Sequence, residues 1–130
     1  MAYVHLVIGL ALVEFFLFGL AVARARHRYG VHPPATTGHE VFERTFRVQM
    51  NTLEQLIIFL PGIVLFAHYI NPQLAAALGA LFVIGRALYF RGYVKAAHAR
   101  HVGFNLSAFA NLALLIGGIF GAVRALIPHG

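Results

Sequence analysis

Three polar side chains, Arg47, Asn51 and Glu54, are spaced i, i+4 and i+7, which places them on one face of a helix. Glu54 stands at the mouth of an otherwise apolar stretch. An ionised carboxylate in that position is costly unless it faces a polar cavity or a cation. A guanidinium, an amide and a carboxylate on one face can hold a small zwitterion by its charged ends.

A second polar stripe follows later in the chain. Arg86, Tyr89 and Tyr93 are spaced i, i+3 and i+7, and Arg100 is expected to continue the same helix face two turns beyond Tyr93. Both stripes fall at the same expected depth in a membrane. Two stripes of complementary chemistry at one depth favour a binding site.

A purely structural explanation exists for the same residues. Arg86 could extend its aliphatic chain along lipid and place its charge in water, while the tyrosines sit at the membrane interface. Glu43 and Arg47 could form an ion pair within one helix.

The polar groups of the two stripes suit a ligand with more anionic than cationic groups. Guanidinium groups bind carboxylates with two hydrogen bonds, and a carboxylate binds an ammonium group. A cation beside a thiol stabilises the thiolate. The chain has no cysteine, so a thiol must come from the substrate. Glutathione carries all of these groups.

Four apolar stretches would position these stripes. The chain is 60% hydrophobic and 11% charged, whereas soluble domains have about 25% charged residues. A membrane-spanning helix needs about 20 mostly apolar residues, and the sequence provides Ala2–Val22, Leu53–Ile70, Leu74–Tyr93 and Val102–Ile127. We therefore predict an all-α integral membrane protein, a four-transmembrane-helix bundle. The predicted helices of this single domain, 1–130, span about residues 2–26, 41–70, 72–98 and 102–127.

The basic residues gather in two of the three connections. The net charge is +6, yet the chain has no long basic run and no nucleic-acid-binding module, so we expect no nucleic acid partner. The connections before the second and fourth helices contain Arg24, Arg26, Arg28, Arg44, Arg47, Arg91, Lys95 and Arg100. The positive-inside rule predicts that these two loops are cytoplasmic and that both termini lie outside. A bacterial inner membrane and an internal eukaryotic membrane both suit such a chain.

The first loop is irregular. Its segment 31–38, with two prolines and a glycine, cannot be helical throughout. The helical pattern is expected to resume near Glu40–Glu43, so the second helix extends beyond the hydrocarbon layer.

Several segments resemble the MAPEG family, the membrane-associated proteins of eicosanoid and glutathione metabolism. Phe42–Gln55 is similar to the family signature FERxxRxQxNxxE, and Arg86–Tyr93 to the motif RxxYFxGY. Pro33–Gly38 resembles the first loop of the family, and Gly103–Ser107 the start of the fourth helix in its type-2 microsomal glutathione transferases. The similarity runs without an evident gap from Arg24 to Ser107.

The resemblance implies a homotrimer of four-helix subunits with a glutathione site between neighbours. It implies that the backbone and charged ends of glutathione contact Arg26, Arg47, Asn51, Glu54, Tyr89 and Tyr93. Gln49 would reach in from the neighbouring subunit, Arg86 would support the site, and Arg100 would be the catalytic residue that stabilises the thiolate.

The expected activity is that of a membrane-bound glutathione transferase. The glutathione thiolate would attack a hydrophobic electrophile that arrives through lipid, and the same thiolate could reduce lipid hydroperoxides. Glutathione would be a co-substrate, with no metal. The alternative is a non-catalytic lipid-presenting scaffold like the lipoxygenase-activating protein of the family. Retention of residues such as Arg47, Asn51 and Arg100 favours the enzyme.

Three positions depart from the family pattern or stand out from it. Gln55 replaces a frequent tyrosine, and His27 replaces a second arginine of the leukotriene-forming synthase, which argues against dedicated leukotriene synthesis. Glu14 lies within the first apolar stretch, where it could face a trimer axis, pair with an arginine or be protonated.

Two further patterns have structural explanations. His98 and His101 are spaced i, i+3, but without Asp or Cys nearby an interfacial polar role is favoured over a metal site. Gly117, Gly118 and Gly121 form a small-residue surface suited to close helix packing.

Overall fold

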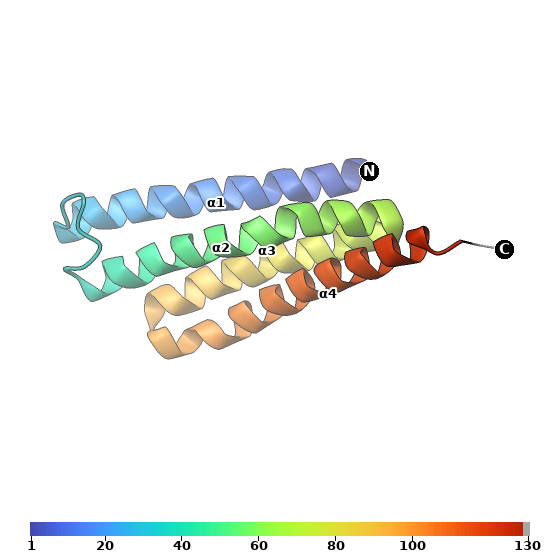
Figure 1. The fold of residues 1–130 in the computed structure, drawn as a ribbon. Helices are drawn as coiled ribbons and strands as arrows, with labels where there is room; N and C mark the ends of the chain where they lie inside the picture. The colour runs from blue at the N-terminus through green and yellow to red at the C-terminus, as the bar shows by residue number, and fades with distance from the viewer. Residues whose placement is uncertain (129–130) are drawn as a thin grey trace.

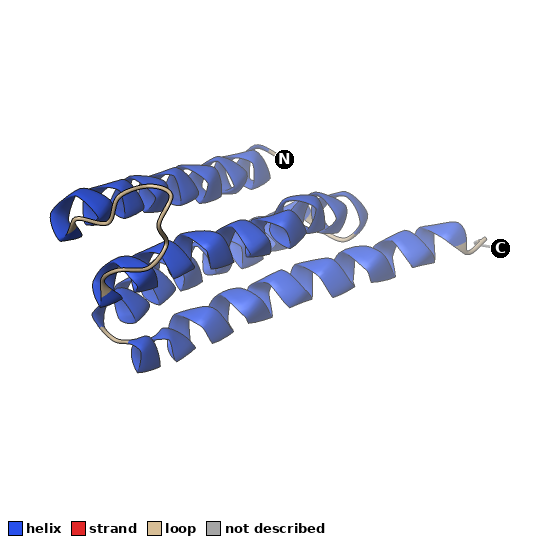
Figure 2. Cartoon of the chain, turned by 60° about the vertical axis from the view of Figure 1, so that its left-hand side comes forward, coloured by secondary structure: helices blue, strands red, loops and turns tan. Residues whose placement is uncertain are grey.

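The computed structural model describes residues 1–128, and these residues form four long helices without a β-strand (Figure 2). In chain order the elements are α1 (Ala2–Tyr29), α2 (Glu40–Tyr69), α3 (Pro72–Lys95), the short 3₁₀ helix η1 (Ala97–Arg100) and α4 (His101–Leu126). Each long helix has the length and apolar composition needed to cross a membrane. The prediction of an all-α, multi-pass membrane protein is confirmed.

The helices run alternately up and down the bundle (Figure 1). α2 and α3 pack against each other, with Phe59 and Phe82 stacked at 4.1 Å between ring centroids, and α1 and α4 each pack on this pair. The outer faces of α1 and α4 expose large apolar side chains such as Phe16 and Phe120. Apolar exposure of this extent fits a surface solvated by lipid tails.

The connection between α1 and α2 is irregular, as predicted. Gly30 ends α1 in the left-handed conformation, with φ 67°. The imidazole of His39 accepts a hydrogen bond from the backbone N–H of Val41 at 3.1 Å, which caps the start of α2. Glu43 then accepts from the N–H of Gly38 at 3.1 Å. The helix therefore resumes at Glu40, within the predicted range.

The end of α3 differs from the prediction. α3 ends at Lys95 instead of continuing to about residue 98, so Arg100 does not continue its face and belongs to η1. Arg44 of α2 donates hydrogen bonds to the carbonyl oxygen of Val94 at 3.2 and 3.3 Å. The guanidinium thus supplies a donor and a positive charge to a carbonyl group at the C-terminal end of α3. The chain then folds back so closely that Ala99 contacts Gly92, where a side chain would clash.

The glycines of α4 allow close packing, as the sequence predicts. Gly117 lies against Phe66 of α2, Gly118 against Leu65, and Gly121 against Tyr69. A Cβ atom at any of these three positions would meet a side-chain atom of α2 at less than 3.0 Å. The pattern therefore serves the contact between α2 and α4 inside one subunit.

Candidate functional site

A pocket of about 400 Å³ opens at the basic end of the bundle, where α2, α3, η1 and α4 meet. Its lining residues are Arg47, Asn51, Tyr89, Tyr93, Arg100, His101, Phe104 and Asn105. Five of these eight are candidate residues from the two predicted stripes. The structure thus brings the stripe of α2 and the stripe of α3 together around one hollow.

Arg86 holds the inner side of this pocket in place. Its side chain is fully buried, and its guanidinium donates to the Thr52 hydroxyl at 2.9 and 3.2 Å and to the Ser107 hydroxyl at 3.2 Å. It also donates to Oδ1 of Asn51 at 2.8 Å and lies 4.4 Å from the ring centroid of Tyr89. One cation therefore links α2, α3 and α4 and orients two pocket residues. The explanation of Arg86 as an arginine that reaches along lipid to water is wrong.

The hydrogen bond from Arg86 determines which group of the Asn51 side chain is available to a ligand. An amide has a carbonyl oxygen that accepts and an NH₂ group that donates. Because Arg86 occupies the oxygen, the NH₂ group of Asn51 is left to donate to a ligand in the pocket. Arg86 therefore orients Asn51 beside the pocket, and its supporting role in a glutathione site stays a prediction.

Arg100 reaches the pocket through η1. Its guanidinium lies 5.7 Å from the ring centroid of Tyr93 and donates a short hydrogen bond to the carbonyl of Ala97. Tyr93 in turn meets Tyr89 edge-on, with 5.4 Å between ring centroids. The turn of η1 thus places the guanidinium of Arg100 over the ring of Tyr93. It does so although α3 does not continue to Arg100 as predicted.

Arg47 of the pocket lining forms an ion pair with Glu54, which does not itself line the pocket, with 3.5 Å between Nη2 and Oε1. Their side chains are 53% and 58% exposed, so either charge is free to exchange its partner for a ligand. This pair replaces the alternative Glu43–Arg47 pair, which is not formed because Glu43 turns back to Gly38.

Besides Glu54, two predicted glutathione-binding residues lie outside the lining of this pocket within the subunit. Arg26 donates to the carbonyl oxygen of Ala35 at 2.7 Å and stacks over Phe42, which fixes it to the first loop. Gln49 is on a different face of α2 and lies close to Gly19 of α1. Neither residue contacts the pocket from inside its own chain.

Several residues that shape the pocket were not predicted from the sequence as site residues. His101, Phe104 and Asn105 line it from the first turn of α4. Thr52 and Ser107 accept hydrogen bonds from the buried guanidinium of Arg86. The sequence contains a pattern that indicates a packed polar face on α4, because Gly103, Ser107 and Asn111 recur every four residues in an apolar helix.

Gly103 explains how α4 comes so near to the pocket. A Cβ atom at this position would collide with the backbone of Tyr89, and one at Gly85 would collide with Ser107. Both glycines therefore permit α3 and α4 to approach closely where Tyr89 and Arg86 must be held.

The structure shows the surroundings of Gln55 and Glu14, two positions that stand out from the family pattern. Gln55 accepts through Oε1 from Asn111 at 3.0 Å, so it faces α4 and does not line the pocket. Glu14 is half-buried in the middle of α1, and its Oε1 has no hydrogen-bond partner. Within residues 1–128, Glu14 forms no ion pair with an arginine.

No group of three or more His, Asp or Glu side chains is gathered for metal binding within residues 1–128.

Comparisons with known proteins agree with this architecture. The MAPEG family matches residues 4–120. An uncharacterized protein of Synechocystis sp. is 51% identical over 114 residues, which cover 88% of this chain and 83% of that protein. Microsomal glutathione S-transferase 2 of Homo sapiens is 40% identical over 112 residues, 86% of this chain and 76% of that protein. Leukotriene C4 synthase of Cavia porcellus is 35% identical over 111 residues, 85% and 74% of the two chains. A helical membrane bundle that matches one family over this length belongs to it: the chain is a member of the MAPEG family.

Proposed function

We propose that this protein is a membrane-bound glutathione transferase. Its similarity to microsomal glutathione S-transferase 2 supports glutathione-dependent transferase activity at the level of the family. The observation that carries the proposal for this chain is the pocket in which Arg47, Asn51, Tyr89, Tyr93 and Arg100 converge. The groups around that hollow are those that complement a small peptide thiol with anionic ends.

The binding roles follow from charge and position. Arg47 of the pocket lining and its ion-pair partner Glu54 offer a cation for a carboxylate and a carboxylate for the ammonium group. Asn51 donates through its free NH₂ group, and the hydroxyl groups of Tyr89 and Tyr93 add hydrogen bonds. These contacts would fix the peptide, so that its thiol points toward Arg100.

Arg100 would then carry the chemistry. A guanidinium beside the sulfur stabilises the thiolate relative to the thiol, and the thiol proton leaves to water at the open mouth. The sulfur forms a bond to the electrophilic carbon while the bond to the leaving group breaks, and the leaving group takes that electron pair. Holding both substrates at one membrane depth supplies the proximity that the reaction needs.

A homotrimer would complete the site, and two residues support this part of the proposal. Arg26 and Gln49 lie outside the pocket of their own subunit, so a role for them requires a neighbouring copy. Gln49 would then reach across the interface from the adjacent α2. Cytoplasmic placement of the basic end and reduction of lipid hydroperoxides by the same thiolate belong to the same proposal.

The test is conjugation of glutathione to an aryl halide by the purified protein. Arg100→Ala should lower kcat by about 10²-fold or more, since an electrostatic group that acts on the reacting atom contributes on that scale. Asn51→Ala should mainly raise the KM for glutathione, because Asn51 binds the peptide and not the sulfur. Equal kcat values for wild type and Arg100→Ala would overturn the assigned role.

A further inference from the structure

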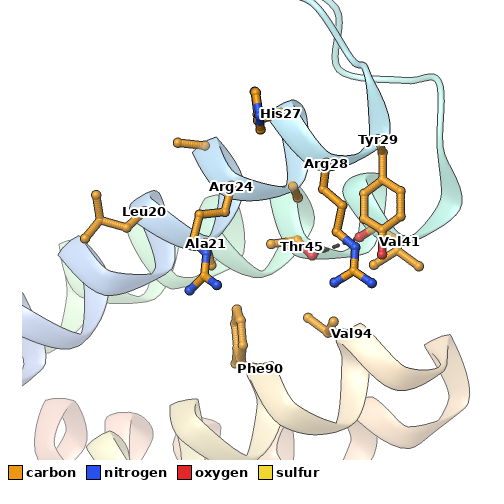
Figure 3. Close-up of a pocket in the computed structure, with 12 residues that line it drawn as sticks. Leu20, Ala21, Arg24, His27, Arg28, Tyr29, Val41, Thr45, Phe90 and Val94 are labelled. Atoms are coloured by element: carbon orange, nitrogen blue, oxygen red, sulfur yellow. Dashed lines mark hydrogen bonds between the residues drawn. The ribbon is translucent and has the colours of Figure 1, made fainter.

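A second and larger cavity, of about 790 Å³, lies between the ends of α1 and α3, over the start of α2. Short side chains on α1 leave this space open, since Ala21 and Ala25 face it where longer residues would fill it. Its opposite wall is formed by Phe90 and Val94 of α3 (Figure 3). Phe18 stacks on Phe90 at 4.8 Å between ring centroids, which adds to the apolar packing on this side of α3.

Two arginines extend over this apolar hollow. Arg24 and Arg28 are spaced one turn apart on α1, and Figure 3 shows both side chains directed from α1 toward Phe90 and Val94. His27 also borders the cavity, but its ring points away from α3 (Figure 3). The guanidinium groups therefore form one wall, and apolar side chains form the other.

Neither arginine is neutralised by the chain. Within residues 1–128, the side chains of Arg24 and Arg28 form no ion pair and no hydrogen bond, and the cavity lining contains no acidic residue. The nearby carboxylate of Glu40 is engaged by Arg44 at 2.8 Å. Arg28 lies only beside the ring of Tyr29, at 5.5 Å from its centroid. The cavity is consequently cationic.

We propose that this cavity binds an anionic phospholipid, with the phosphate on Arg24 and Arg28 and the acyl chain against Phe90, Val94 and Leu20. Two guanidinium groups one helical turn apart match a phosphate, which accepts hydrogen bonds in the planar fork geometry of arginine. The cavity also lies at the depth where headgroups lie, because the apolar part of α1 ends at Val22. Charge and apolar area together thus select a lipid over a soluble anion.

This lipid site is separate from the proposed glutathione pocket, and the two share no lining residue. The arginines that explain orientation in a membrane would therefore have a second role as ligands of one lipid molecule per subunit.

The test uses the full chain, purified in a neutral detergent, with native mass spectrometry to count bound lipids. Phosphatidylglycerol and phosphatidylcholine of equal chain length are titrated separately. A preference of at least about tenfold for phosphatidylglycerol is expected, given that each basic residue near the surface strengthens attraction to anionic lipid several-fold. The double variant Arg24→Gln, Arg28→Gln should lose this preference.

Two further variants distinguish the effect of the arginine charges from the effect of the cavity volume. Ala21→Leu keeps both arginines but fills the hollow, and it should weaken phosphatidylglycerol binding. Arg91→Gln removes an exposed arginine at the same end of the bundle that does not line the cavity, and it should bind lipid like wild type. Equal binding of both lipids by wild type would overturn the proposal. It would also fail if the double variant and Arg91→Gln lose binding equally, or if glycerol phosphate without acyl chains binds as tightly as the lipid.

Discussion

Replacing Arg86 with methionine should destabilise the bundle and disturb the proposed glutathione pocket at the same time. The side chain donates four hydrogen bonds that join α3 to α2 and α4. Polar contacts between transmembrane helices contribute about 0.6 kcal/mol each on average. Acceptors that are left unpaired in a buried site cost about 1–3 kcal/mol each, although the Ser107 hydroxyl already donates to the carbonyl of Phe104 and loses less. We expect the free energy of unfolding to fall by about 2–4 kcal/mol.

The assay is reversible unfolding in mixed micelles, followed by far-ultraviolet circular dichroism. Arg91→Met is the matched control, because Arg91 is on the same helix but exposed, and its replacement should change the free energy of unfolding by less than about 0.5 kcal/mol. Arg86→Lys should fall between the two, since an ammonium group keeps the charge but cannot reach all three partners in the fork geometry. The reasoning is refuted if Arg86→Met and Arg91→Met are equally stable.

Further predictions concern single side chains of the site. Gly103→Ala should lower the thermal stability and raise the KM for glutathione, because the added Cβ would displace Tyr89. Gly9→Ala is the control and should change neither quantity, because Gly9 has open space around it. Melting curves and steady-state kinetics compare the two variants. Arg44→Gln should loosen the end of α3 and lower kcat by shifting η1 and Arg100, and faster hydrogen exchange at residues 94–100 would show this directly. His101→Gln should reduce conjugation less than Arg100→Ala does, since the imidazole lines the pocket but the arginine is the group assigned to the sulfur; equal losses in kcat would contradict that division.

The helices and the faces of the two stripes could be predicted from sequence because both depend on local periodicity. Apolar length defines a span, and spacings of three and four residues define a face, so Arg47 and Asn51 could be placed beside Tyr89 and Tyr93. The start of α2 near Glu40 followed from the prolines and glycine that precede it.

The remaining features depend on contacts between distant segments. α3 ends at Lys95 where Arg44, about fifty residues earlier, binds its last carbonyl groups, and no proline marks that end. The burial of Arg86 depends on Ser107 and Thr52, which supply acceptors from two other helices. The cavity beside Arg24 arises because small residues of α1 face Phe90 across the bundle. None of these arrangements has a local signature.

Ultraviolet difference absorbance of the glutathione thiolate, recorded on purified protein in detergent, tests the central claim most directly. Wild-type protein should produce a thiolate signal that saturates with glutathione. Arg100→Ala should lose most of this signal while still binding glutathione through Arg47 and Asn51, as measured by equilibrium dialysis. Neither thiolate nor binding in the wild-type protein would contradict the account and favour a non-catalytic lipid-presenting scaffold.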